Sequence, residues 1–502
     1  MRIEEVTRGA IVLDDVTAAG AKVSVRVDGH RVWTTVLDGR LEWPAALSPR
    51  LTGRARLALE DPETGVELLA CDVAFDESSD RTQIVDRHGR WLAVNKWGNL
   101  IRTLEGADAA GLRARMLTNG TELVDLLRTW ELEPLLIGGS LLGAVRDGAL
   151  LPHDDDLDLT VVWEVDDAIE AVVAHRELER RLTEAGYTVV PHSHAHLQVT
   201  FRHDDGAVDH YIDIFATFLR GDVFSQPFPF RNRDLGRVDL LPGRPIVVEG
   251  VSMPGPARPE KWLAMAYGEG WRVPDPSFSF ETPASTTRRF DGWFGAFNGG
   301  RDHWERHFEE APFLDDVPRP DPALLESVRL KSASGAIDLG CGDGASTAML
   351  AGLVDRVVGL DYSLEAMAAA RSRSLAKARF EYWNANDELD VLELTARLLR
   401  SETRWLLHAG WLLHVIGREQ RHRLLRMVSD CGADAALHAS FDTELPPWFA
   451  VGDPSTWHLP VEVLAEEVAE IGLDMSVVAG GVRSTAEGER AWAAARIVAP
   501  AR

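Results

Sequence analysis

The pattern of apolar and polar positions changes along the chain and divides it into regions. Residues 1–95 contain short alternating runs, such as Lys22 to Val27, which are separated by turn signals such as Asp28-Gly29. This pattern is typical of strands in a small antiparallel sandwich. From about residue 110, an amphipathic run from Leu112 to Trp130 precedes alternating strand-like and helix-like segments. We predict a β-sandwich-like accessory module over 1–95 and an α+β domain over 110–285.

A further change occurs near Gly335, where a strand, a glycine-rich loop and a helix follow one another. Because α/β alternation continues from there to the end of the sequence, we predict a Rossmann-like α/β domain over 331–502. Residues 286–330 are rich in proline, glycine and aromatic side chains and show little periodicity. We predict that this segment connects the domains of a multidomain chain, and that it packs on its neighbours or helps to form an acceptor pocket.

The first group of chemically informative residues lies between Ile137 and Thr160. Gly139-Ser140 ends a strand-like run and opens a helix, where backbone N–H groups and the helix dipole favour a phosphate. Arg146 lies further along the same helix and offers a forked, positively charged group to phosphoryl oxygens. These residues predict a binding site for phosphates.

Acidic residues follow this helix. Asp156 and Asp158 project from one face of a predicted strand, because side chains alternate with a period of two. Asp213 lies within an apolar run, and a buried carboxylate needs a partner. Carboxylates suit a hard cation that bridges phosphates, so we predict that these aspartates bind Mg²⁺ or Mn²⁺ in a nucleotidyltransferase-type site. A solvated acidic loop without a ligand is the alternative.

The run from Gly139 to Arg146, followed by Pro152-His153-Asp154-Asp155-Asp156-Leu157-Asp158, resembles the LicD and fukutin-related family. The runs from Ile212 to Phe215 and from Pro259 to Trp271 match further landmarks, whereas His153 stands where an aromatic residue is usual. The resemblance implies transfer of a substituted phosphate, such as phosphocholine or a polyol phosphate, from a CDP-linked donor to a sugar hydroxyl. By this resemblance Asp156, Asp158 and Asp213 hold the metal, Gly139, Ser140 and Arg146 hold the donor phosphates, and Asp154 or Asp155 deprotonates the acceptor.

Three histidines in the same region, His192, His194 and His196, alternate along a predicted strand. Side chains at alternate positions share one face of a strand, and three histidines on one face can bind Zn²⁺. Partly exposed strand positions without a metal are the alternative interpretation, and we do not include these histidines in the predicted site.

The second group is the run Asp338-Leu339-Gly340-Cys341-Gly342-Asp343-Gly344, which ends a strand and enters a helix. Its glycines permit a tight turn and the close approach of a ligand. About 20 residues later, a second strand ends at Asp361, the position at which Rossmann-like units hold ribose hydroxyls. These residues resemble the first two motifs of class I S-adenosylmethionine methyltransferases.

The resemblance implies S-adenosyl-L-methionine as the cofactor, with ribose bound by Asp361 and adenine near Tyr362. Asn384 stands where family members often place aspartate. His414 follows the fourth strand, where these folds face the methyl acceptor, and its near-neutral titration suits a general base for O-methylation; capping or packing of the next helix is the alternative. The predicted cofactor-binding residues are Asp338, Gly340, Cys341, Gly342, Gly344, Asp361, Tyr362 and Asn384.

Charge, hydropathy and cysteine content indicate which classes of partner and which cellular compartment to expect. The formal net charge of −26 disfavours nucleic acid, which requires basic patches. No stretch of about 18 uncharged apolar residues occurs, so we predict no membrane span. The sequence has three cysteines, Cys71, Cys341 and Cys431, and they form no CxxC pair. We therefore predict a location in the reducing cytoplasm, with the inner face of the membrane as a further possibility.

Together these patterns predict a bifunctional transferase of cell-surface glycan modification. The middle domain would add a phosphate-linked group to a glycan or lipid-linked glycan, and the last domain would methylate the same product. Residues 1–95 would pack against the rest of the chain or dock other glycan-synthesis enzymes. The alternatives are a tailoring enzyme for a small specialised metabolite and a scaffold with only one active domain.

Overall fold

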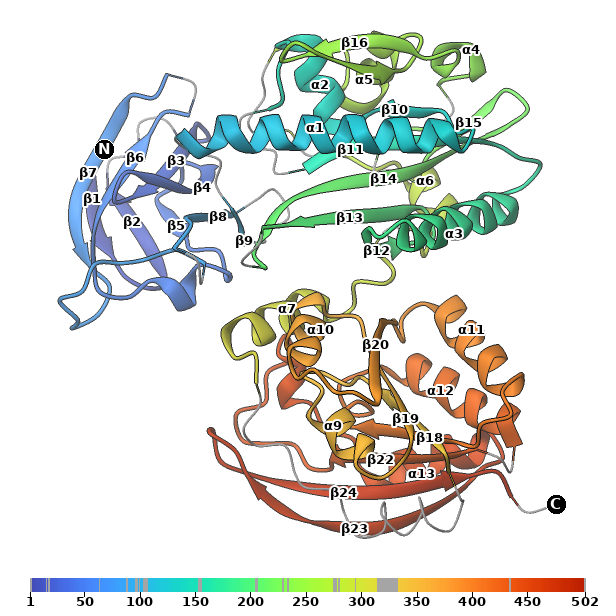
Figure 1. Cartoon of the computed structure of the whole chain (residues 1–502). Coiled ribbons are helices and arrows are strands. Elements are labelled where there is room, and N and C mark those ends of the chain that lie inside the picture. The colour runs from blue at the N-terminus through green and yellow to red at the C-terminus, as the bar shows by residue number, and fades with distance from the viewer. Residues whose placement is uncertain are drawn as a thin grey trace. The chain divides into compact units, whose positions relative to one another are not determined.

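The computed structural model of the chain forms two compact units, Met1–Phe294 and Gly295–Arg502 (Figure 1). Its described residues are all except 1, 15, 17, 18, 63, 87, 88, 95–97, 99, 103–106, 152–155, 204, 205, 228, 229, 233, 274–277, 279, 294, 314–332, 433, 434, 501 and 502. Within the described residues, no helix combines the length and apolar character that crossing a bilayer requires. The predicted base candidates Asp154 and Asp155 lie outside the described residues, so their role stays a prediction.

Short antiparallel strands form the first part of the N-terminal unit. One sheet has the order β1-β2-β5, another has the order β4-β3-β6-β7, and β8 pairs with β9. Ile11 from the first sheet and Val25 and Leu57 from the second belong to one apolar core. The strands are β1 (Arg2–Val6), β2 (Ala10–Asp14), β3 (Lys22–Val27), β4 (His30–Val36), β5 (Arg40–Glu42), β6 (Arg54–Glu60), β7 (Glu67–Ala74), β8 (Leu92–Val94) and β9 (Leu100–Arg102).

A mixed sheet forms the second part of this unit, in the order β10-β11-β14-β13-β12, with β15 paired to β14. The central strands β11 and β14 are parallel, whereas their outer neighbours are antiparallel to them. Leu157, Leu159, Ile212 and Ile214 are fully buried, as expected of strands covered on both faces. The strands are β10 (Pro134–Leu136), β11 (Asp156–Glu164), β12 (Thr188–Ser193), β13 (His196–Arg202), β14 (Val208–Arg220) and β15 (Val223–Ser225).

Helices pack against this sheet. The long helix α1 contacts β10, β11 and β14 (Figure 1), and α3 contacts β12 and β14. Helix α3 begins after Asp167, whose side chain accepts hydrogen bonds from the N–H groups of Ile169 and Glu170 and so caps the helix. The remaining elements of this unit include the hairpin of β16 (Arg244–Val248) and β17 (Val251–Gly255). The helices are α1 (Ala107–Thr129), α2 (Gly138–Arg146), α3 (Ala168–Glu184), α4 (Arg237–Leu240), α5 (Pro259–Tyr267) and α6 (Ala284–Arg289).

The C-terminal unit is built on one sheet in the order β20-β19-β18-β21-β22-β24-β23. Strands β18 to β22 run parallel, and β24 is antiparallel to both of its neighbours. Buried apolar side chains such as Leu339 and Leu407 fill its core, each contributing about 1.5–3 kcal/mol by leaving water. The strands are β18 (Gly335–Leu339), β19 (Arg356–Asp361), β20 (Ala378–Tyr382), β21 (Trp405–Gly410), β22 (Ala436–Asp442), β23 (Asp474–Ser484) and β24 (Glu489–Val498).

This topology confirms the predicted Rossmann-like fold of the C-terminal region. Helix α7 (Arg301–Glu310) packs against α10 and belongs to the same compact unit. Part of the segment interpreted from the sequence as a connection is therefore integral to this unit. The other helices are α9 (Ala345–Ala351), α10 (Leu364–Ser372), α11 (Glu388–Leu399), α12 (Arg418–Cys431) and α13 (Val461–Glu470).

Candidate functional sites

Three aspartates meet on the central strands of the mixed sheet. The parallel pairing of β11 with β14 places Asp158 directly opposite Asp213 and Asp156 opposite Tyr211. One carboxylate oxygen from each of Asp156, Asp158 and Asp213 lies within 4.8 Å of the others. Clustered, partly buried carboxylates repel one another, and a bound cation offsets both the repulsion and the burial. The residues therefore fit a divalent cation with oxygen ligands.

The N-terminus of α2 positions Asp158. The Gly139 N–H donates to Asp158 Oδ2 at 2.8 Å, and the Asp158 N–H donates to Ser140 Oγ at 2.9 Å. Ser140 is fully buried, and its hydroxyl orients Asp158; its predicted contact with a donor phosphate stays a prediction. Arg146, at the other end of α2, forms an ion pair with Asp147 at 2.8 Å.

Asp213 is held from the neighbouring strand β13. The Nε2 atom of His196 lies 3.1 Å from Asp213 Oδ2, and the Gln198 side-chain amide donates to Oδ1 at 3.1 Å. Burial by itself would raise the pKa of Asp213, but the charges and hydrogen bonds around it, led by His196, outweigh burial and lower that pKa. The carboxylate is therefore ionised at neutral pH, as a metal ligand must be.

The histidine run does not lie on one strand, contrary to the interpretation from the sequence. His192 belongs to β12 and His196 to β13, and His194 lies in the tight turn between them. The rings of His192 and His196 stack across the hairpin with centroids 4.7 Å apart. The histidines occupy every second position through the turn as well, so the sequence pattern gave no sign that the chain reverses there.

Gly138 is expected to be essential for this geometry. Its φ is +60°, and an added Cβ would lie 2.0 Å from Asp158 Oδ2, so a Gly138→Ala substitution must displace the carboxylate. We expect Mn²⁺ affinity, measured by calorimetry, to fall by about 10–100-fold, as for loss of groups that orient metal ligands. Gly148→Ala is the matched control, since Gly148 has a φ of +70° with open space around its Cβ position. Equal losses in the two variants would contradict the positioning role of Gly138.

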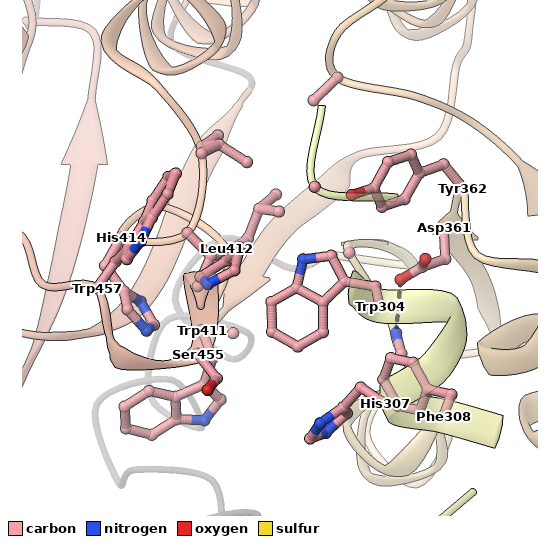
Figure 2. A pocket seen from close by; sticks show the side chains of 18 of the residues that line it. Trp304, His307, Phe308, Asp361, Tyr362, Trp411, Leu412, His414, Ser455 and Trp457 are labelled. Atoms are coloured by element: carbon pink, nitrogen blue, oxygen red, sulfur yellow. Dashed lines mark hydrogen bonds between the residues drawn. The ribbon is translucent and has the colours of Figure 1, made fainter. Parts of the chain in front are cut away.

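In the C-terminal unit, a cavity of about 620 Å³ opens beside the glycine-rich loop (Figure 2). Gly340 and Gly342 have φ values of +66° and +52°, a backbone conformation that residues with a side chain rarely adopt. A Cβ on Gly342 would also lie 3.1 Å from Phe308. The Gly342 N–H donates to Asp361 Oδ2 at 2.9 Å, so the loop after β18 and the end of β19 form one cradle.

Asp361 is the acidic group of this cradle. It is mostly buried, and burial, together with the nearby charge of Glu305, raises its pKa to about 6. Its Oδ1 atom accepts the N–H of Ser363 at 2.9 Å. A buried carboxylate at the end of a strand, beside a glycine turn, is suited to accept hydrogen bonds from a ribose diol.

Most of the predicted cofactor residues lie in this cavity, but two do not. Asp338 is buried beneath it, where its carboxylate accepts the Thr347 hydroxyl at 2.6 Å and lies 2.7 Å from His408 Nδ1. Gly344, at a φ of +79°, allows close packing against Ala370. Both residues therefore shape the strand and helix that carry the loop. The predicted residues that line the cavity are Gly340, Cys341, Gly342, Asp361, Tyr362 and Asn384.

The Asn384 side chain forms hydrogen bonds within the protein. Its side-chain amide donates to the Phe297 carbonyl at 2.8 Å, and its Oδ1 accepts the N–H of Asn386 at 2.9 Å. The residue that stands where aspartate is common thus ties the chain before α7 to the edge of the cavity.

Helix α7 covers the cavity and was assigned no site residue in the sequence analysis. Trp304, His307 and Phe308 line the cavity from this helix. Glu305 accepts hydrogen bonds from the Ser363 hydroxyl at 2.9 Å and the Leu364 N–H at 2.9 Å, and so caps α10. Aromatic residues in an aperiodic stretch were the only sequence signal for this role.

The other side of the cavity is polar and aromatic. His414 lines it together with Trp411, Trp457, Arg483 and Arg490. Trp411, like His414, follows the fourth strand, which the sequence analysis placed at the methyl acceptor, whereas the sequence pointed to none of the other three. Burial lowers the pKa of His414 from its ordinary value of 6.5 to about 3. Its ring is therefore neutral at pH 7, and its buried Nδ1 atom makes no hydrogen bond to the described residues.

Comparison with known proteins supports both predicted catalytic domains. Residues 132–258 match the family described as LicD/FKTN/FKRP, nucleotidyltransferase domain, and residues 336–431 match the family described as Methyltransferase domain. The fold and sites thus define an enzyme of the transferase class. More particularly, the chain carries a LicD-type domain and a methyltransferase domain, as the sequence predicted, and the second match supports S-adenosylmethionine as a cofactor.

The two curated relatives described next are both named as methyltransferases. A trans-aconitate 2-methyltransferase of Methylobacterium radiotolerans is 32% identical over 167 residues, covering 28% of this chain and 57% of that protein. One of Variovorax paradoxus is 46% identical over 71 residues, covering 14% of this chain and 27% of that protein. The chain thus spans about half or less of these relatives. A solved S-adenosylmethionine-dependent methyltransferase of Anabaena variabilis is 15% identical, with 39% of this chain and 93% of that chain covered and a TM-score of 0.31.

Proposed function

We propose that the chain is a bifunctional transferase that modifies a cell-surface glycan. The observation that carries the proposal is the presence of two separate sites in one chain. One is the cluster of Asp156, Asp158 and Asp213, and the other is the cavity beside Gly342 and Asp361. The first site would transfer a substituted phosphate from a CDP-linked donor to a sugar hydroxyl, and the second would methylate the same product.

For phosphate transfer, the three aspartates would hold Mg²⁺ or Mn²⁺, which supplies charge neutralisation and alignment of donor phosphates. His196 and Gln198 keep Asp213 in place, and Gly139 and Ser140 keep Asp158 in place. Phosphoryl transfer depends chiefly on positioning and electrostatics, which is what this rigid arrangement provides. Asp154 or Asp155 remains our candidate for the base that takes the acceptor proton.

For methyl transfer, the glycine loop and Asp361 would hold S-adenosylmethionine, which supplies an electrophilic methyl group on sulfur. Trp304 and Phe308 from α7 cover the cavity and exclude water from it. His414 lines the opposite side as a neutral ring. With so low a pKa it is a weak base, so we assign it a hydrogen bond to the acceptor in place of full proton removal.

A second candidate function is the tailoring of a small metabolite. The relatives named trans-aconitate 2-methyltransferase act, by that name, on a small acid, which favours a small acceptor for this cavity too. A scaffold role with only one active domain is the remaining alternative. Intact carboxylates in one site and an intact glycine cradle in the other argue against it.

The proposal is tested by calorimetry and by mass spectrometry of the full chain. We expect S-adenosylhomocysteine to bind without metal, and CDP-choline, CDP-glycerol or CDP-ribitol to bind only with Mg²⁺ or Mn²⁺. Glycan from cells with the intact chain should carry both a phosphate-linked group and a methyl group. Binding of neither ligand would favour the scaffold, whereas modification of small acids alone would favour the tailoring enzyme.

The affinity for S-adenosylhomocysteine should depend on pH through Asp361. Because burial raises the pKa of Asp361 to about 6 and ribose hydroxyls donate to the ionised carboxylate, protonation removes the acceptor. We expect the affinity to be constant above about pH 6 and to fall by up to about tenfold per pH unit below it. Calorimetry between about pH 7.5 and pH 5 measures this, and an affinity that stays level or rises toward acid pH would contradict the role of Asp361.

A further inference from the structure

The far side of the cavity contains a buried group of charges around Asp442. Arg483 donates to both oxygens of Asp442, at 3.0 and 2.9 Å, and Arg490 lies 3.0 Å from Oδ2. His414 Nε2 lies 3.6 Å from the same oxygen. Figure 2 shows Trp411, His414, Ser455 and Trp457 on one side of Trp304, with Asp361 and Tyr362 on the other. The charged group therefore lies on the side of the cavity away from the glycine cradle.

These charges do not balance. Asp442 is fully buried and carries one negative charge, whereas Arg483 and Arg490 carry two positive charges, and His414 is neutral at pH 7. Asp453 and Glu487 also line the cavity, but they are substantially exposed, so solvent screens their charges. The excess of positive charge in this buried group favours an anionic ligand beside it, although the chain as a whole has a formal net charge of −26.

Arg483 packs on the ring of a residue with a strained backbone. Its guanidinium lies 4.5 Å from the centre of the Trp411 ring, and Trp411 has a φ of +63°. Such a backbone conformation costs about 1–3 kcal/mol and is typical of functional sites. The backbone N–H of Trp411 donates to the Ser440 carbonyl at 2.7 Å, which fixes the backbone in this conformation. Arg490, in contrast, donates to the carbonyls of Ser455 and Trp457 at 2.6 Å each and has a structural role.

We propose that the methyl acceptor carries a carboxylate, that Arg483 and His414 hold it beside Trp411, and that a carboxylate oxygen receives the methyl group. His414 would donate from Nδ1–H, the ring nitrogen that makes no hydrogen bond to the described residues. This inference rests on the methyltransferase activity proposed above and names its acceptor. A hydroxyl acceptor needs a base, and the low pKa of His414 makes it a weak one. A carboxylate is already ionised at neutral pH and needs only positioning.

The chemical step balances without a proton. A lone pair of the carboxylate oxygen forms the new bond to the methyl carbon, while the bond between that carbon and sulfur breaks and leaves its electron pair on sulfur. The products are a methyl ester and S-adenosylhomocysteine. Because Arg483 neutralises the carboxylate before the reaction, its role is to bind and align the acceptor beside the cofactor.

The test measures acceptor binding to the full chain saturated with S-adenosylhomocysteine, so that no reaction occurs. The probes are trans-aconitate and galacturonate, with galactose as the neutral counterpart of the second. We expect both acids to bind and galactose not to bind. The Arg483→Gln variant should lose about 10–100-fold in affinity for the acids, with the affinity for S-adenosylhomocysteine unchanged, and Arg483→Lys should recover part of the loss.

Arg397→Gln is the matched control, since Arg397 pairs with Glu381 at 2.6 Å in the same unit and does not line the described cavity. It should leave the affinity for the acids unchanged. A methyl ester is cleaved by mild alkali, so label from methyl-labelled S-adenosylmethionine should be released from the product as methanol. Binding of galactose as tightly as galacturonate, unchanged acid binding in Arg483→Gln, or an alkali-stable product would overturn the proposal. Failure of S-adenosylhomocysteine to bind would instead refute the methyltransferase function itself.

Discussion

Replacing Asp156 with alanine is expected to lower phosphate transfer by about a thousandfold and to leave methyl transfer unchanged. The three clustered carboxylates are proposed to hold the metal, whose charge stabilisation is worth several kcal/mol, and each 1.4 kcal/mol corresponds to about tenfold in rate. The measurements are CMP release from the CDP-linked donors in the presence of Mg²⁺, and Mn²⁺ binding by calorimetry.

Asp125→Ala is the control for this variant. Asp125 lies on α1 in the same unit, with 69% of its side chain exposed and only a 3.7 Å pair with Arg128, so its loss should change neither reaction. A folded Asp156→Ala variant that retains phosphate transfer would contradict the metal site. Loss of both activities in a folded variant would contradict the independence of the two sites.

Replacing Asp361 with alanine is expected to have the opposite effect. The variant should bind S-adenosylhomocysteine about 100-fold more weakly, because hydrogen bonds to a charged group contribute about 1.5–3 kcal/mol each, while phosphate transfer continues. The change also removes the acceptor of the Gly342 and Ser363 N–H groups, so the loop loses its fixed shape. Calorimetry measures the affinity, and CMP release measures the retained reaction.

Asp355→Ala is the matched control, because Asp355 precedes the start of β19 whereas Asp361 ends it, and the Asp355 side chain is 92% exposed. Normal affinity in the control and normal thermal unfolding in both variants would assign the loss to the site. Undiminished affinity in Asp361→Ala would show that the cofactor is held elsewhere.

The cofactor side of each site could be predicted because its residues are close together in sequence. Gly340, Gly342 and Asp361 lie on consecutive strands and loops, and the turn and the acid have a regular spacing. Asp156 and Asp158 likewise share one strand face. For Ser140 and Asp338 the structure adds what the sequence could not give, because their buried side chains bond to the protein itself.

The acceptor side could not be predicted for a physical reason. The pairing of β24 between β22 and β23 brings together Asp442, Arg483 and Arg490. No local sequence pattern predicts which strands pair. The covering helix α7 contains only two apolar residues, Trp304 and Phe308, among charged and polar ones, which is too few to reveal a helix by apolar periodicity. A turn inside the run of His192 to His196 was missed for the related reason that alternation alone does not reveal where a strand ends.

The boundary between donor and acceptor sides of the methyltransferase cavity also has an evolutionary consequence. The segment that matches the family, residues 336–431, contains Gly340, Gly342 and Asp361. Trp304 precedes this segment, and Arg483 and Arg490 follow it. Trp411 and His414, on the acceptor side, lie within the matched segment. A match to this segment therefore covers the residues proposed to hold the methyl donor but leaves out both arginines of the acceptor side, so relatives that share it can differ in the acceptor that they methylate.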